Sequence, residues 1–114
     1  MAEACYAEKK ERSMFCMKYF VVESVMNENL PVSPQQMEEI YVPAHVAHLH
    51  EGIDAGMVLL GGPCETGGFL LLRAESREKV DAFLAEDPFR INNFNRFVVK
   101  EFLPKDRADM VKDW

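Results

Sequence analysis

Hydrophobic residues gather in four short stretches whose composition is typical of β-strands. The first stretch, Lys18–Met26, is rich in β-branched and aromatic residues and is followed by asparagines and a proline that end it. The other three are Met57–Gly62, Phe69–Ala74 and Phe94–Leu103. A turn is predicted around the junction of the second and third stretches, where residues typical of turns cluster: Gly61, Gly62, Pro63, Gly67 and Gly68.

Two other segments repeat their apolar residues with the period of an α-helix. Pro34–Ala55 is one of them, and Ser33 is suited to cap its start. Because an interior proline removes a backbone hydrogen bond, we expect a short helical lead-in and then a main helix with Pro43 near its first turn. Gly56 is expected to end this main helix at the position after its last turn.

The second helix is predicted over Ser76–Glu86, where Ser76 can cap the start and an apolar stripe includes Val80, Phe83 and Leu84. Pro88 stops it. The predicted order is therefore strand, helix, strand, strand, helix, strand. This order predicts an α+β, ferredoxin-like βαββαβ fold, in which a four-stranded antiparallel sheet carries both helices on one face.

The predicted strands are apolar on both faces of the sheet. In the first strand, for example, Val21 and Val22 point to opposite faces, and the third strand places Leu71 opposite Leu72 in the same way. Two helices can cover only one face, so the other would expose a large apolar surface. We expect a homodimer through this face. The alternative is that the terminal segments fold over it.

Composition narrows the class of protein further. The chain has 114 residues and a formal net charge of −6, which argues against a nucleic-acid partner, and its apolar runs are too short to cross a membrane. Its three cysteines form no CxxC pair, so a reducing, cytoplasmic location is expected. Residues 1–16 are interpreted as a disordered N-terminal arm or as sequence upstream of a start at Met17, and residues 105–114 as a charged tail.

A histidine on the main helix is the first candidate for chemistry. On a helical wheel His45 falls near the centre of the inward arc, His48 lies beside it one turn on, and His50 faces solvent. A single inward histidine is also compatible with an ordinary core residue. A catalytic role for His45 therefore requires a second polar group that contacts its imidazole.

Asp87 is the candidate partner, because it continues the buried stripe of the second helix. It would also lie at a helix C-terminus, where the helix dipole disfavours a negative charge. A buried carboxylate in that position calls for a proton donor, and His45 comes from the same side of the sheet. In such a pair the carboxylate orients the imidazole and leaves its other nitrogen for general acid–base chemistry. The alternative is that Asp87 only begins an Asp-Pro turn.

Four segments together resemble YCII-like proteins in order and spacing: Pro43–Leu49, Gly56–Pro63, Glu75-Ser76 and Glu86–Phe89. The resemblance covers residues 17–104, which form one domain. It implies a ferredoxin-like fold paired as a dimeric α+β barrel, with a His and an Asp facing a pocket as the active site. Matched by motif, these are His45 and Asp87.

The chain departs from the family at one position that bears on substrate. Many members resemble Arg-Pro-Ala-His in the first segment, whereas Val42 stands here in place of that arginine. Arg73 or Arg90 could substitute for it, although a solvated charge explains either equally simply. The residues expected to contact substrate are His48, Arg73 and Phe89.

Two functions follow from these expectations. The first is a small cofactor-independent enzyme, lyase- or isomerase-like, because the resemblance includes a dehydrochlorinase-like activity and the wider barrel superfamily includes muconolactone-type isomerases. Its substrate would be a small cyclic or aromatic metabolite. The alternative is a module that binds such a molecule without converting it. A metal or haem site that uses His45, His48 and Cys64 is a third hypothesis, but no further ligands are evident, so no metal is predicted.

Overall fold

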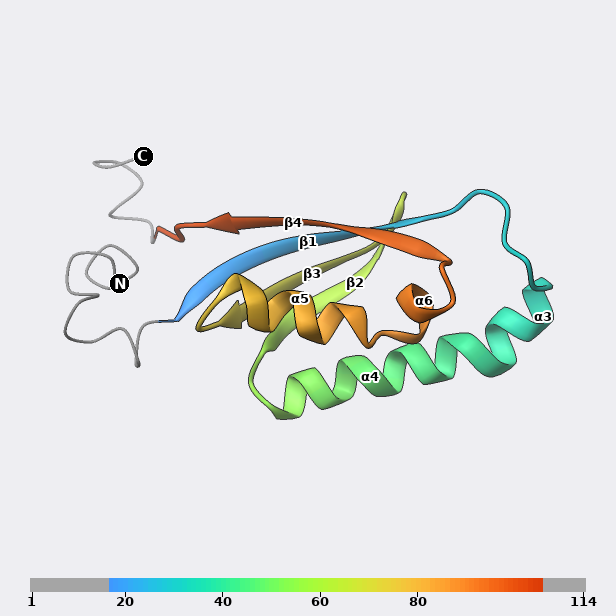
Figure 1. The fold of residues 1–114 in the computed structure, drawn as a ribbon, viewed down its shortest axis with the longest axis horizontal. Coiled ribbons are helices and arrows are strands. Elements are labelled where there is room, and N and C mark those ends of the chain that lie inside the picture. The colour runs from blue at the N-terminus through green and yellow to red at the C-terminus, as the bar shows by residue number, and fades with distance from the viewer. Residues whose placement is uncertain (1–16, 106–114) are drawn as a thin grey trace.

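A computed structural model describes residues 17–105 and shows one sheet layer with all of its main helices on one side (Figure 1). The strands are β1 (Lys18–Met26), β2 (Val58–Cys64), β3 (Gly67–Ala74) and β4 (Asn95–Phe102). The helices are α3 (Pro34–Gln36), the π-helical turn η2 (Met37–Tyr41), α4 (Val42–Asp54), α5 (Arg77–Ala85) and α6 (Pro88–Ile91). The predictions of a disordered arm for residues 1–16 and of a charged tail for residues 105–114 fall almost entirely outside the described residues.

The sheet has the order β2-β3-β1-β4 and is antiparallel throughout. In the central strand β1, Val22 lies opposite Leu70 of β3 and Val99 of β4. The predicted ferredoxin-like α+β fold is therefore confirmed. No helix of residues 17–105 is long and apolar enough to cross a membrane.

Pro43 lies in the first turn of α4, as predicted. The π-helical turn η2 comes directly before it, and the Val42 N–H reaches back to the Met37 carbonyl. A π turn widens the helix at the point where an interior proline ring would crowd the preceding turn. The lead-in and the main helix thus form one continuous helical segment. Gly56 ends it with φ +79°, the left-handed conformation that favours glycine at this position.

The hairpin between β2 and β3 is tighter than the sequence suggested. The glycine-rich residues predicted to form a turn instead continue the two strands, with Gly62 opposite Phe69 and Pro63 opposite Gly68. Glu65 and Thr66 alone make the turn. Extended glycines suit this position because they leave space above the sheet, and the cavity described below uses that space.

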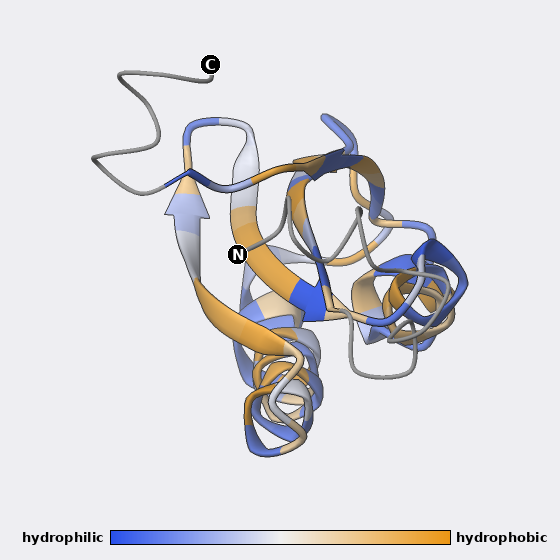
Figure 2. Cartoon of the chain, turned by 90° about the vertical axis from the view of Figure 1, so that its left-hand side faces the viewer, coloured by the Kyte–Doolittle hydropathy of each residue, from blue (hydrophilic) through white to orange (hydrophobic). Residues whose placement is uncertain are grey.

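The hydrophobic core lies between the sheet and the helices. Its buried members come from the helix side of the strands and from α5: Phe20, Val22, Val58, Leu70, Leu72, Ala74, Val80 and Leu84. Stretches of hydrophobic colour run along the strands between paler and hydrophilic positions, and the helices alternate between hydrophobic and hydrophilic colour (Figure 2).

The opposite face of the sheet also carries apolar side chains, as the alternation predicted. Its members follow from the strand register: Tyr19, Val21, Val25, Leu60, Phe69, Leu71, Val98 and Phe102. Leu60 and Phe69 are exposed. None of the helices within residues 17–105 covers this face (Figure 1).

Candidate functional site

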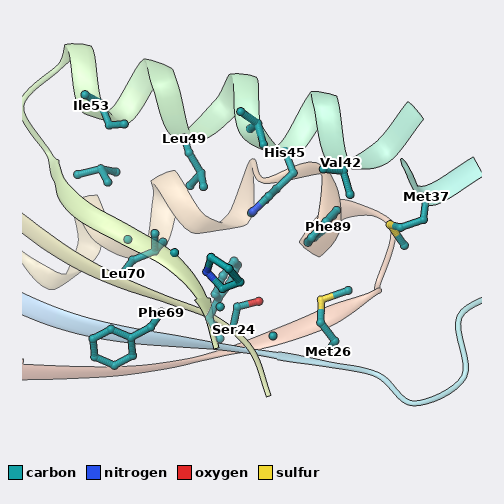
Figure 3. A pocket seen from close by; sticks show the side chains of 18 residues that line it. Ser24, Met26, Met37, Val42, His45, Leu49, Ile53, Phe69, Leu70 and Phe89 are labelled. Atoms are coloured by element: carbon teal, nitrogen blue, oxygen red, sulfur yellow. The ribbon is translucent and has the colours of Figure 1, made fainter. Parts of the chain in front are cut away.

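A cavity of about 500 Å³ opens between α4 and the sheet (Figure 3). Its lining comes from η2, α4, α6 and the sheet: Ser24, Met26, Met37, Val42, His45, Val46, Leu49, Ile53, Val58, Gly61, Gly62, Pro63, Gly67, Gly68, Phe69, Leu70, Phe89 and Phe97. Nearly all of these are apolar. Within residues 17–105, the polar side chains of the lining are those of His45 and Ser24.

Glycines of the hairpin between β2 and β3 line this cavity and leave space where a side chain would otherwise lie. A Cβ atom at Gly61 would lie 2.4 Å from Leu70 Cδ2 and 2.9 Å from the Phe69 carbonyl oxygen, so this position does not accept a side chain without rearrangement. At Gly68 a Cβ would meet Ser24 Cβ at 3.8 Å, which is an ordinary contact. The strand at Gly68 therefore leaves room above Ser24 that a ligand can fill.

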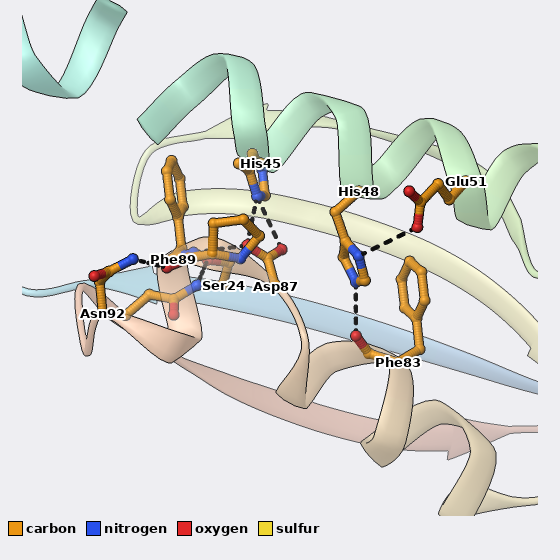
Figure 4. A network of polar contacts seen from close by, with 10 residues as sticks. Ser24, His45, His48, Glu51, Phe83, Asp87, Phe89 and Asn92 are labelled. Carbon is orange, nitrogen blue, oxygen red and sulfur yellow. Dashed lines mark hydrogen bonds and ion pairs between the residues drawn. The ribbon is translucent and has the colours of Figure 1, made fainter. Parts of the chain in front are cut away.

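The side chains of His45 and Asp87 point toward each other and are in contact (Figure 4). His45 Nδ1 lies 2.9 Å from Asp87 Oδ1 and 2.8 Å from Oδ2. The Asp87 side chain is 0% exposed, whereas that of His45 is 19% exposed. The histidine thus holds a buried carboxylate with one edge of its ring and still reaches the cavity.

The position of Asp87 reconciles the two interpretations of this residue. Helix α5 ends at Ala85, so Asp87 does not continue it; Asp87 is the N-cap of α6, and its Oδ1 accepts a hydrogen bond from the Phe89 N–H at 2.9 Å. The Asp-Pro turn forms, and it is this turn that aims the carboxylate at His45. A carboxylate at a helix N-terminus is in a favourable place, unlike the C-terminal position that the sequence suggested.

Phe89 completes the surroundings of the histidine. Its ring stacks on the imidazole of His45 with 4.1 Å between centroids and 4° between planes. The contact restricts rotation of the imidazole, and Phe89 itself lines the cavity.

The hydrogen bond to Asp87 also sets the tautomer of a neutral His45. A carboxylate can only accept, so Nδ1 carries the proton and Nε2 keeps a free lone pair. No residue in the range 17–105 forms a hydrogen bond with Nε2. The nitrogen that could take a proton from a ligand is therefore unoccupied by protein groups of the described chain.

His48 does not line the cavity, contrary to the expectation that it contacts substrate. Its Nε2 lies 2.7 Å from the Phe83 carbonyl oxygen, to which it donates, and its ring stacks on Phe83 with 4.3 Å between centroids. These contacts join α4 to the last turn of α5 (Figure 4). They explain the burial of His48 by packing.

Neither arginine considered as a substitute for the missing one lines the cavity. Arg73 alternates with Leu72 and Ala74 on β3 and so belongs to the helix-free face of the sheet. The Arg90 guanidinium donates hydrogen bonds to the Asn93 side chain and to the Asn95 carbonyl oxygen. Val42 does line the cavity, and within residues 17–105 no lysine or arginine lines it beside Val42.

Ser24 was not predicted as a site residue, although the sequence pattern contains an indication of it. It occupies a helix-facing position of β1, between Val22 and Met26, where an apolar residue is the rule. The Asn95 amide donates to its hydroxyl oxygen at 2.7 Å, and both side chains are buried.

The three residues considered as metal ligands are not brought together. His45 and His48 each use a ring nitrogen on a different partner, and Cys64 Sγ lies 3.4 Å from Thr66 Oγ1. Across residues 17–105 no group of three or more His, Cys, Asp or Glu side chains is placed to hold a metal ion.

Comparisons with known proteins agree with this fold. No family model and no curated protein matches the chain. Among solved structures, it is similar to 5-chloro-2-hydroxyhydroquinone dehydrochlorinase from Burkholderia phenoliruptrix AC1100, determined in complex with 2,5-dihydroxybenzoquinone. The two chains are 27% identical with a TM-score of 0.59, and the match covers 76% of this chain and 95% of the other. A related fold superfamily is thus supported, while membership of the YCII-like family stays a prediction.

Proposed function

We propose that this protein is a small enzyme that uses His45 and Asp87 for general acid–base chemistry on a small cyclic molecule. The observation that carries the proposal is the contact of His45 Nδ1 with both oxygens of the buried Asp87 carboxylate, beside an apolar cavity. A histidine held in this way presents Nε2 as a base and has a neighbouring anion to stabilise the imidazolium that forms. Phe89 restricts the ring to that orientation.

The cavity supports a small uncharged substrate. Its volume of about 500 Å³ falls in the ordinary range for small-molecule sites, roughly 300–1,000 Å³. Its apolar walls favour a ring, and a base in the wall favours removal of a proton from that ring. The solved dehydrochlorinase acts on a chlorinated hydroxyhydroquinone, which supports elimination as the reaction type. In such an elimination His45 Nε2 accepts a proton, the electron pair forms a new double bond, and chloride leaves.

The proposal is tested by incubating the full chain with a panel of substrates and following products by NMR. The panel comprises 5-chloro-2-hydroxyhydroquinone, its unchlorinated parent and unsaturated lactones. We expect proton loss from one class of ring, with release of one chloride per turnover if the chlorinated ring is the substrate. Binding across the panel with no product would contradict the enzyme and leave the alternative, a module that binds its ligand unchanged.

We also propose that a second copy of the chain covers the helix-free face of the sheet. Leu60 is 60% exposed on this face, beside Leu71 of the neighbouring strand, and Phe69 is exposed as well. A contiguous apolar surface of this kind is unusual on a monomer, and two-fold pairing of identical faces is the commonest way to bury one.

Leu60→Glu should weaken this dimer by at least tenfold in Kd, because a desolvated charge would face the partner sheet. Sedimentation equilibrium measures the effect. Ile91→Glu is the matched control, since Ile91 is 66% exposed and lies on α6 in the helical layer. A wild-type chain that sediments as a monomer, or two variants with equal dissociation constants, would contradict the dimer.

A further inference from the structure

Ser24 is the second polar side chain that lines the cavity, and it lies on the wall opposite His45 (Figure 3). His45 comes from α4, whereas Ser24 comes from the central strand β1. The Ser24 residue is 7% exposed. Its hydroxyl is therefore a buried polar group in the wall of a mainly apolar cavity.

The hydrogen bonds of Ser24 leave its proton unused. A hydroxyl can donate once and accept twice. Asn95 Nδ2 donates to Ser24 Oγ at 2.7 Å, which uses an acceptor position, and no residue in the described range accepts the Ser24 O–H. Asn95 Oδ1 is likewise buried without a partner there. Buried donors without acceptors are costly, so a group in the cavity that accepts from Ser24 would gain binding energy.

We propose that Ser24 donates a hydrogen bond to an oxygen atom of the ligand and thereby selects ligands with a carbonyl or similar uncharged oxygen. Asn95 positions the hydroxyl from the far side of the cavity wall. This inference deepens the proposed function, on which it rests for the identity of the site. The part of the chain that the structure describes places no lysine or arginine in the cavity lining, so a neutral oxygen fits the hydroxyl better than a carboxylate.

The same contact would serve the reaction as well as binding. When a base removes a proton next to a conjugated carbonyl, negative charge develops on the carbonyl oxygen. A donor fixed at that oxygen stabilises the charge. With His45 on one wall and Ser24 on the other, the ring between them would lose a proton at one edge and gain charge at the opposite one.

The test compares two probes that differ in one group: acetophenone, which has a carbonyl oxygen, and 2-phenylpropene, which has a CH2 group in its place. Their dissociation constants are measured by NMR titration for the wild type and for Ser24→Ala. We expect Ser24→Ala to shift the ratio of the two constants about fivefold against acetophenone, the value of one ordinary hydrogen bond. Binding of 2-phenylpropene should not weaken.

Ser76→Ala is the matched control, because this serine caps α5 away from the cavity and its loss should leave the ratio unchanged. A ratio that Ser24→Ala does not change would overturn the proposal, because Ser24 would then not donate a hydrogen bond to the carbonyl oxygen of the ligand. Failure of both probes to bind the wild type would also overturn it, since the cavity would then not admit such a ring.

The outcome is independent of turnover. If Ser24→Ala shifts the ratio but no substrate is converted, Ser24 selects the ligand of a binding protein and the enzyme proposal fails. If substrates are converted and depend on His45 while the ratio stays constant, the enzyme proposal stands and the role of Ser24 fails.

Discussion

Replacing His45 with asparagine is expected to lower kcat about 100- to 10,000-fold, the usual contribution of a positioned general base. Asparagine is the informative substitution because its Nδ2 occupies nearly the place of His45 Nδ1 and can still donate to Asp87. The buried carboxylate would keep its partner, so the fold should survive. The nitrogen that is lost is Nε2, which has no partner within residues 17–105.

His50→Asn provides the control for this experiment, since His50 is exposed on the same helix. It should retain full activity. Steady-state kinetics on any substrate found in the panel measure both variants, and circular dichroism checks that each is folded. A folded His45→Asn protein with wild-type kcat would show that His45 is a packing residue and would contradict the acid–base proposal.

The helical wheel placed His45 and His48 side by side but could not say what each would meet. Residues three apart on a helix differ by about 60° in direction. That difference turns His45 toward α6 and Asp87, and His48 toward the Phe83 carbonyl at the end of α5. The positions of α5 and α6 around α4 are set by tertiary packing, which the periodicity of one helix does not contain.

The alternation of residues along the strands likewise does not reveal how the sheet packs against the helices. Alternation along β3 separates Arg73 from Leu72, but both faces of the sheet are apolar, so the pattern does not reveal which face carries the helices. Arg73 lies on the helix-free face and away from the cavity. Ser24 was not predicted as a site residue for a different reason. The strand was recognised by its apolar residues, so a single polar residue on the buried face was not interpreted as a functional signal.

Local chemistry was more informative than periodicity at Asp87. The Asp-Pro pair correctly indicated a turn, and the expected contact with His45 also forms. The turn and the contact with His45 appeared as alternatives because the sequence placed Asp87 at the end of the second helix. The short helix α6 makes them compatible, and its four residues are too few to show a periodic pattern.

Asp87→Asn is expected to lower kcat by a similar factor, about 100-fold or more, by changing which nitrogen of His45 carries the proton. Asp87 Oδ1 accepts from the Phe89 N–H, so an asparagine must keep its oxygen there and turn its NH2 group toward His45. The NH2 group donates to Nδ1, which must then give up its proton to Nε2. The base would be lost although the ring has not moved.

The nitrogen-15 spectrum of the imidazole tests this directly, because protonated and unprotonated ring nitrogens differ widely in chemical shift. We expect neutral His45 to carry its proton on Nδ1 in the wild type and on Nε2 in Asp87→Asn. Asp81→Asn is the matched control: Asp81 pairs with Arg77 at 3.0 Å on the surface of α5, and its loss should change neither the tautomer nor kcat. A tautomer that stays on Nδ1 in Asp87→Asn, with kcat unchanged, would mean that Asp87 does not orient His45. The buried carboxylate would then serve only to begin α6, and catalysis would have to be sought elsewhere on the cavity wall.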